Sequence, residues 1–172
     1  MNEKANKSSV PKTSRSDSHP QSTQILVHEH AFLSGMTEHQ LRIISDCSRP
    51  IHFAAGEVIF REGDPADRFF LIQRGRVALE SNVKGAGLSF IQTIGPGEVL
   101  GWSWLFPPFF WHFDARAMET TDAFFISGKV LREECESDHD LGYELLKRVA
   151  AVLVQRLQAT RRRLLELPGM PD

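Results

Sequence analysis

The stretch GEVIFREGD at residues 56–64, together with FFLIQRGRVALE at residues 69–80, is the most informative part of the sequence about its fold. Each stretch contains a short run of aliphatic and aromatic residues with a glycine at or near its end. Such runs are typical of β-strands, and glycines are typical of the turns between them. Between Pro50 and Ser127 a turn signal recurs roughly every 10 residues. This spacing predicts an antiparallel barrel or sandwich rather than alternating strands and helices.

Helical patterns flank the β-rich segment on both sides. Thr37 and Gln40 are spaced as a capping box, which predicts the start of a short helix. A second short helix is expected around residues 130–133. A long helix is expected over about residues 140–167, where a proline and a glycine end it. The expected fold class is therefore mainly β with flanking helices and a long C-terminal helix.

Composition divides the chain into four segments. Residues 1–23 are rich in serine, lysine and asparagine and contain no aromatic side chain. Burial of so few apolar groups cannot offset the entropy of ordering, so we expect a disordered polar tail. We expect one β domain with its short helices over residues 24–137, a dimerisation helix over residues 138–167, and a short tail over residues 168–172.

The overall composition excludes several classes of protein. With 172 residues and 41% hydrophobic content, the chain can build one packed core. A net charge of −2 gives no bulk electrostatic reason to bind nucleic acid or an anionic membrane. No apolar run approaches the ~20 residues of a membrane span, and no hydrophobic signal segment follows the N-terminus. We therefore expect a cytoplasmic protein with no membrane partner.

The cysteines and histidines do not form a recognisable metal or catalytic pattern. Cys47 and Cys135 lie far apart in the sequence, which argues against a zinc ribbon or a disulfide framework and favours two buried thiols. Residues 28–30 read His-Glu-His but have no third ligand nearby, so we expect an exposed polar stretch. His52 and His112 are isolated, unlike the clustered ligands of a barrel metalloenzyme. The sequence predicts no metal site and no enzymatic activity.

The long helix carries a stripe with alternating spacings of four and three, which is typical of a coiled-coil seam. The stripe consists of Leu146, Ala150, Leu153, Leu157, Thr160 and Leu164. Further apolar residues lie beside it, namely Leu145, Val149, Val152 and Leu165. One side of the helix can then pack on the β domain while the other meets a partner helix. We expect a homodimer through Leu146, Ala150, Leu153, Leu157 and Leu164; the alternative is that both sides are buried within one chain.

The segment at 56–64 resembles the cyclic-nucleotide-binding domains of the catabolite activator and fumarate–nitrate regulator superfamily. Residues 70–79 are similar to the family's strand, glycine turn and strand, and residues 94–101, IGPGEVLG, to the entry of its phosphate-binding cassette. The resemblance covers about residues 32–165. It implies an eight-stranded, double-stranded β-roll similar to a jelly roll, followed by a dimerisation helix. It also implies a regulatory role.

Transcription factors of this superfamily continue past the long helix into a helix-turn-helix domain. This sequence ends five residues after Leu167. We therefore expect no direct recognition of DNA. Arg156 and residues 161–163 form a basic cluster near that end, which we interpret as solvated helical turns favoured by the helix dipole.

The cassette is where the sequence departs from this resemblance. In nucleotide-binding members a glutamate that holds the ribose hydroxyl follows the glycine corresponding to Gly101, and here Trp102 follows it. The family's Arg-Ser/Thr-Ala triplet, which grips the cyclic phosphate, reads Trp-His-Phe at residues 111–113. A register shift of one residue does not supply an arginine either. We therefore expect cyclic AMP and cyclic GMP to bind weakly or not at all.

All three tryptophans and four phenylalanines gather in residues 102–113. One interpretation is a pocket relined for an aromatic or apolar ligand; the other is that the aromatic side chains plug the old pocket. Backbone amides of a short helix at about residues 102–106 could also bind an anion, assisted by His112 if its imidazole is protonated. The candidate ligand-binding residues are Gly97, Glu98, Val99, Gly101, Trp102, Ser103, Trp111, His112, Phe113 and Arg116.

These observations support two hypotheses about function. The first is a non-enzymatic sensor module that binds a non-standard small ligand and signals through its C-terminal helix to a dimer partner or another protein. The second is a degenerate β-roll with a plugged pocket that serves as a protein-interaction subunit of a larger complex. No cofactor is assigned by the sequence.

Overall fold

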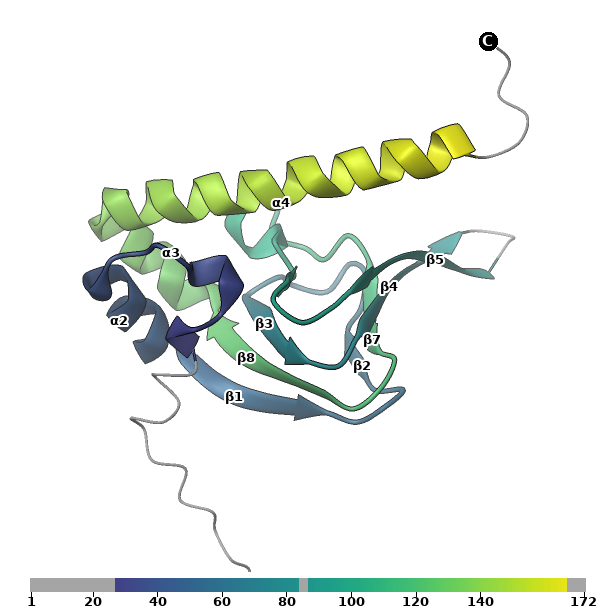
Figure 1. The fold of residues 1–172 in the computed structure, drawn as a ribbon, viewed down its shortest axis with the longest axis horizontal. Coiled ribbons are helices and arrows are strands. Elements are labelled where there is room, and N and C mark those ends of the chain that lie inside the picture. The colour runs from purple at the N-terminus through teal and green to yellow at the C-terminus, as the bar shows by residue number, and fades with distance from the viewer. Residues whose placement is uncertain (1–26, 84–86, 167–172) are drawn as a thin grey trace, which may run out of the picture.

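The protein is described by a computed structural model over residues 27–83 and 87–166, and its ribbon is shown in Figure 1. Eight strands form two antiparallel sheets, with the order β1-β8-β3-β6 in one and β2-β7-β4-β5 in the other. The strands are β1 (Ser48–Phe53), β2 (Val58–Phe60), β3 (Arg68–Arg74), β4 (Val77–Val83), β5 (Gly87–Ile94), β6 (Val99–Leu100), β7 (Asp114–Ala117) and β8 (Thr121–Ser127). The expected eight-stranded β-roll is confirmed. The tails expected at 1–23 and 168–172 lie outside the described residues.

The strand β3 is buried on both faces of its sheet. Phe69 and Leu71 belong to the apolar cluster between this sheet and the helices, whereas Phe70 and Ile72 belong to the cluster between the two sheets. Successive side chains of a strand point to opposite faces, so a strand covered on both sides needs a continuous apolar run. This explains why the sequence of β3 does not alternate between apolar and polar residues.

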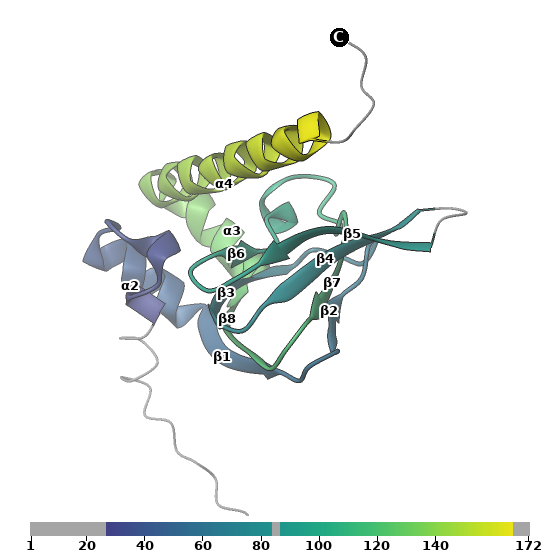
Figure 2. The same ribbon diagram turned by 45° about the vertical axis from the view of Figure 1, so that its right-hand side comes forward.

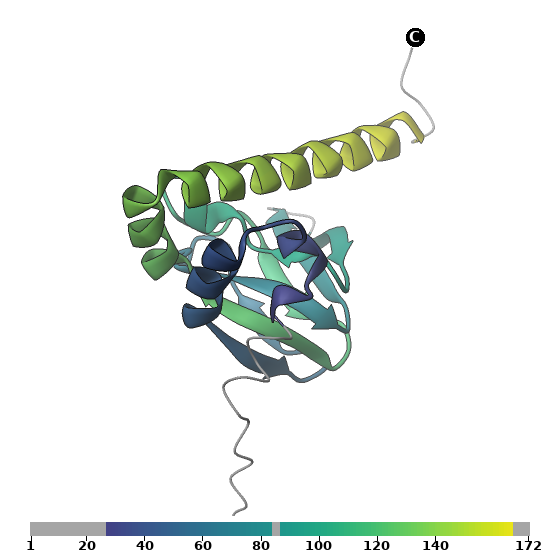
Figure 3. The ribbon, with the colours of Figure 1, turned by 60° about the vertical axis from the view of Figure 1, so that its left-hand side comes forward.

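Helices cover the outer face of that sheet (Figures 2 and 3). They are the 3-10 turn η1 (Ala31–Leu33), α2 (Glu38–Asp46), the 3-10 turn η2 (Ser103–Leu105), α3 (Gly128–Ser137) and α4 (His139–Glu166). The predicted capping box is present: the amide of Gln40 donates to Thr37 Oγ1 at 3.3 Å, and the amide of Thr37 donates to Gln40 Oε1 at 3.1 Å. The local start signal therefore sets the first residue of α2.

The helix α4 runs across the molecule, from the side of α2 and α3 to the side of β4 and β5 (Figure 1). Its 28 residues span about 42 Å. Leu141, Leu145 and Val149 are buried against the rest of the chain, whereas Leu146 and Leu157 are 45% and 70% exposed. The two sides of the helix thus differ as expected, and the alternative that both are buried within one chain is wrong. No helix in the described ranges has the length and apolar character that a membrane span requires.

The expectation of an exposed stretch at residues 28–30 is wrong for His30, which is buried. Its Nδ1 accepts the amide of Phe32 at 3.2 Å, so its Nε2 donates to the carbonyl of Ile72 at 3.0 Å. Burial lowers the pKa of His30 and favours this neutral form. His30 therefore caps η1 and ties it to β3, a role that only long-range contacts reveal.

The two cysteines are free and half-buried. Cys47 ends α2, and Cys135 lies in α3. Burial raises the pKa of each thiol to about 11. Such thiols are protonated at neutral pH and act as small apolar groups.

Candidate functional site

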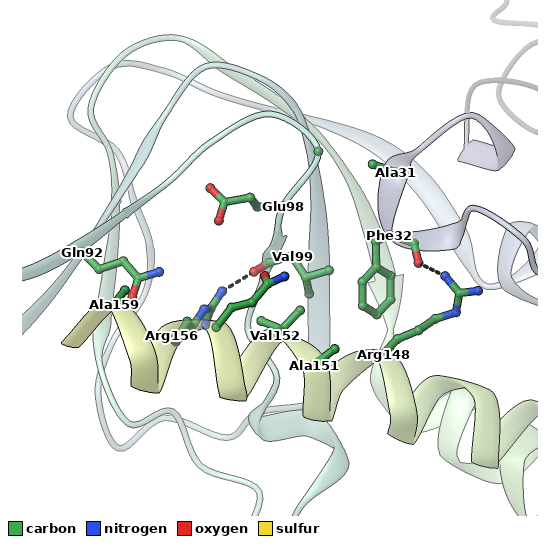
Figure 4. A pocket seen from close by; sticks show the side chains of 12 residues that line it. Ala31, Phe32, Gln92, Glu98, Val99, Arg148, Ala151, Val152, Arg156 and Ala159 are labelled. Atoms are coloured by element: carbon green, nitrogen blue, oxygen red, sulfur yellow. Dashed lines mark hydrogen bonds between the residues drawn. The ribbon is translucent and has the colours of Figure 1, made fainter. Parts of the chain in front are cut away.

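The structure places the candidate ligand-binding residues in three separate locations. Six of them surround a cavity of about 10 Å³, here called the cassette cavity: Gly101, Trp102, Ser103, Trp111, His112 and Phe113. Three others line a pocket of about 490 Å³ beneath α4, here called the α4 pocket: Gly97, Glu98 and Val99 (Figure 4). Arg116 lies in neither. A single relined pocket is therefore not what these residues form.

The indole ring of Trp111 fills the cassette cavity. It is 2% exposed and stacks on Phe60 with ring centroids 3.9 Å apart. Gly101 has a φ of +86°, and a Cβ at this position would lie 2.7 Å from Cζ3 of Trp111. Only glycine leaves room for the ring here. Trp111 occupies the sequence position that the resemblance gives to the phosphate-binding arginine.

Backbone hydrogen bonds hold Trp111 in place from both sides. Its amide donates to the carbonyl of Asp64 at 2.9 Å, and its carbonyl accepts the amide of Gly63 at 2.9 Å. A space of about 10 Å³ is barely enough for one water molecule. In the arrangement seen here, the cassette cavity has no room for a nucleotide.

The three tryptophans point into three different environments. Trp104 packs between the sheet and the helices, where it stacks on Phe69 at 4.8 Å, whereas Trp111 lies between the two sheets. Trp102 is half-exposed and stacks on His112 at 5.4 Å. The aromatic run in the sequence is therefore divided among three places: the cluster between sheet and helices, the cluster between the two sheets, and the partly exposed edge of the cassette cavity. The plugging interpretation fits this arrangement better than the relined pocket does.

The helix expected at residues 102–106 is shorter than predicted. The observed η2 is a single 3-10 turn whose first residue is Ser103. The amide of Leu105 donates to the carbonyl of Trp102, and the amide of Phe106 donates to that of Ser103. These two amides are already used within the turn. Any anion cradle here would have to use the amides at the start of the turn, those of Ser103 and Trp104, so the cradle suggested by the sequence stays a prediction.

Arg116 points away from the cassette cavity. It lies on β7 between Ala115 and Ala117, both of which face the interior between the sheets. Since strand residues alternate, Arg116 faces outward. Its Nε lies 3.2 Å from Glu80 Oε2, and its Nη1 donates to the carbonyl of Gly56 at 3.2 Å. These partners assign Arg116 to the outer surface of the sheet.

Arg156 is the functional candidate that the sequence analysis missed. Its side chain reaches from α4 to line both the cassette cavity and the α4 pocket. Its Nη2 donates to the carbonyl of Val99 at 2.6 Å (Figure 4), while its buried Nε has no hydrogen-bond partner in the described part of the chain. Burial lowers the pKa of Arg156, and nearby Glu98 partly offsets this effect. The expectation that Arg156 belongs to a solvated turn is wrong.

A signal for Arg156 exists in the sequence. The side of α4 that faces the β-roll carries residues at spacings of four and three: Leu145, Val149, Val152, Arg156 and Ala159. An arginine at an inward position of an otherwise apolar stripe must find a carbonyl or an anion to bind. The sequence pattern predicts that the aliphatic residues of this stripe pack on the β domain, and the structure adds Arg156 to the same side.

Arg148 forms another part of the α4 pocket but has a structural role. Its Nε donates to Glu144 at 3.0 Å, and its two terminal nitrogens donate to the carbonyls of Phe32 and Ser34 at 2.5 and 2.8 Å. Figure 4 shows its contact with Phe32 at the edge of the pocket. Arg148 therefore fastens η1 to α4 and leaves little donor capacity for a ligand.

Potential metal ligands are not gathered anywhere in residues 27–83 and 87–166: no three His, Cys, Asp or Glu side chains there are placed to share an ion. His52 pairs with Asp122 instead, at 2.8 Å on the surface. The side chains around the cassette cavity and the α4 pocket can bind through hydrogen bonds, charge and apolar contact.

Comparison with solved structures shows similar folds. A candidate cyclic nucleotide-binding protein from Geobacter metallireducens GS-15 is 31% identical, with a TM-score of 0.70, over 80% of this chain and 97% of that one. A cyclic nucleotide-binding domain from Methylobacillus flagellatus KT is 19% identical, with a TM-score of 0.72, over 89% of this chain and 86% of that one.

Curated relatives match over shorter regions. A CRP-like cAMP-activated global transcriptional regulator of Mycobacterium tuberculosis is 25% identical over 119 residues, which are 69% of this chain and 51% of that protein. The chain spans about half the length or less of the curated relatives it matches. Residues 50–138 match the family described as the cyclic nucleotide-binding domain. With this match over more than half of its length and the β-roll described above, the chain belongs to the cyclic nucleotide-binding domain family.

Proposed function

We propose that the chain is a non-enzymatic regulatory module whose cassette is closed to cyclic AMP and cyclic GMP. In this proposal it responds to a small ligand of another kind and transmits the response through α4. The observation that carries it is the buried ring of Trp111, which occupies the position of the phosphate-binding arginine and leaves a cavity of about 10 Å³.

Charge supports the closed cassette as strongly as volume does. A cyclic phosphate in a partly buried site needs a cationic fork or several donors, and Trp111 offers a single indole N–H. Trp102 likewise replaces the carboxylate that accepts the ribose hydroxyl. Each lost charge-assisted hydrogen bond is worth about 1.5–3 kcal/mol. Together they weaken binding by roughly a hundredfold to ten-thousandfold.

The helix α4 is suited to transmit a response because its two sides have different neighbours. Its inner side contributes Arg156 to the cassette cavity and the α4 pocket, whereas its outer side exposes an apolar stripe. Exposed leucines at four-three spacing are typical of a two-helix interface. We therefore propose a homodimer in which a change beneath α4 alters the helix that the partner contacts.

Calorimetry with cyclic AMP and cyclic GMP tests the closed cassette. The wild type is expected to show no binding tighter than about the millimolar range. The double variant Trp102→Glu, Trp111→Arg restores both charged groups and is expected to gain affinity, provided that its thermal unfolding shows a folded protein. A low-micromolar dissociation constant for the wild type would overturn the proposal, because the ring would then have to leave its site.

The second candidate function is a protein-interaction subunit that binds no small ligand. The filled cassette cavity and the exposed stripe on α4 favour it as well. Ligand-dependent thermal shifts distinguish the two, since a ligand that binds only the folded state raises apparent stability as its concentration passes the dissociation constant. A module that serves only as a docking subunit shows no such shift with any small molecule.

A further inference from the structure

We propose that the α4 pocket binds a small organic carboxylate through Arg156. The pocket of about 490 Å³ lies between η1, the segment from β5 to β6, and α4 (Figure 4). Its volume falls within the range of small-molecule sites. This inference rests on the proposed function, because it names the ligand class to which the module responds and places it outside the cassette.

The pocket has an apolar wall with a few polar groups, as small-molecule sites usually have. Phe32 contributes its ring from η1, and Val99, Ala151 and Val152 contribute aliphatic groups. Gln92 and Gln155 add amide groups that can donate or accept hydrogen bonds. A ligand with an apolar body and one polar head fits this lining.

The charges around the pocket select an anionic head group. Arg148 is paired with Glu144, and the exposed Glu98 accepts the amide of Gly95 at 2.6 Å. No carboxylate oxygen of residues 27–83 and 87–166 lies within 4.0 Å of the Arg156 guanidinium. The exposed Glu98 only partly offsets the burial of this cation, and an anion in direct contact with the guanidinium would offset more of that cost.

A carboxylate suits Arg156 better than a phosphate does. A guanidinium can bind a planar carboxylate with two parallel hydrogen bonds. Arg156 already donates through Nη2 to Val99, so it retains donors for one small anion. A phosphate dianion needs further cationic donors, and those of Arg148 are taken by Glu144 and two carbonyls. The head group is therefore a monoanionic carboxylate, and its apolar body lies toward Phe32 and Val152.

A ligand in this position touches both α4 and the β-roll. It would join Arg156 of α4 to the segment at Val99, which is already linked by a hydrogen bond. Such a ligand stabilises the packing of α4 on the roll, and its binding energy appears as added stability of the folded state.

Hexanoate, benzoate and indole-3-acetate are suitable probes, each compared with its neutral amide and with inorganic phosphate. Thermal shift and calorimetry on the full chain are expected to show saturable binding of at least one carboxylate, with a dissociation constant of about 10 μM to 1 mM. The amide and phosphate are expected to bind about tenfold more weakly or not at all. Equal binding of acid and amide, or a preference for phosphate, would overturn the carboxylate assignment.

Two variants separate the site from the rest of the molecule. Arg156→Gln is expected to weaken carboxylate binding by about 10- to 100-fold, because it removes the charged hydrogen bonds. The matched control Arg161→Gln removes an exposed arginine from the same helix and is expected to leave binding unchanged. Ala151→Trp fills the pocket from its wall while keeping Arg156 in the sequence, and it is also expected to abolish binding.

The outcomes also distinguish this inference from the proposed function. Failure of all three carboxylates to bind at up to about 20 mM, or unchanged binding by both Arg156→Gln and Ala151→Trp, would refute the site. Neither result affects the closed cassette, which is tested with cyclic AMP. Conversely, tight cyclic AMP binding would refute the closed cassette whatever the carboxylates do.

Discussion

The cassette cavity and the α4 pocket share Arg156, yet one is filled and the other is open. Large aromatic rings occupy the first, with Trp111 stacked on Phe60. Small side chains, Ala31, Ala151 and Ala159, form part of the wall of the second. Because protein interiors are close-packed, the volume of a few side chains decides whether a backbone cavity remains available. Within one β-roll, one cavity can therefore be filled by side chains while a neighbouring pocket stays open.

If the cassette cavity is filled, Trp111 must be a structural part of the core. Trp111→Ala is expected to destabilise the fold by about 3–5 kcal/mol, because it removes a buried ring and leaves a cavity. Urea unfolding measures this free energy. The control Phe110→Ala truncates a neighbouring aromatic residue that is 45% exposed and should cost about 1 kcal/mol or less. Equal costs would mean that the ring does not plug the cavity.

The outer side of α4 faces away from the α4 pocket, and we propose that it contacts a second copy of the chain. A variant on this side tests the dimer. Leu153→Glu places two unpaired charges against each other at a dimer seam and is expected to yield monomer, at a cost of roughly 2–4 kcal/mol to association. Light scattering measures the mass. Gln158→Glu adds the same charge off the stripe and should leave a dimer. A wild type that is monomeric at high concentration would remove α4 as a dimer interface.

The close approach of Trp111 to Gly101 can be separated from backbone strain by a pair of variants. Gly101→Ala and Gly56→Ala each put a Cβ on a residue with φ above +80°, but only the first meets the indole ring. Each substitution is expected to lower the free energy of unfolding by about 1–2 kcal/mol, because an alanine must adopt a left-handed backbone conformation. Gly101→Ala is expected to cost about 1–3 kcal/mol more from overpacking. Chemical denaturation of both variants gives the difference, and equal values would indicate a loosely held ring.

Acid should weaken the packing of η1 on the β-roll, because its capping residue His30 is buried in the neutral form. Burial lowers the pKa of His30 in the folded state, so the unfolded chain takes up the proton first. Its contribution to stability is complete above pH ~6.5 and is lost as pH falls below that value. The expected slope from this group is less than about 1.4 kcal/mol per pH unit. His30→Gln should flatten the decline measured by denaturation between neutral and mildly acidic pH, and His139→Gln, which changes an exposed histidine, should not.

Features that depend on neighbouring residues can be predicted from the sequence. The glycine-punctuated runs located the strands, and Thr37 with Gln40 located the start of α2. The absence of the cassette glutamate and arginine was also readable, because a missing charged group needs no coordinates to be noticed. Turn chemistry, capping and spacing are local properties, so they remain valid before the chain is folded.

The direction in which similar side chains point, by contrast, depends on how the chain packs. Trp102, Trp104 and Trp111 belong to one aromatic run, yet they enter a rim, the helix-facing cluster and the core between the sheets. Likewise, Arg156 turns inward to Val99, while Arg116 turns outward to Glu80. The direction of a side chain depends on which elements cover each face, and that is set by contacts between residues far apart in the sequence.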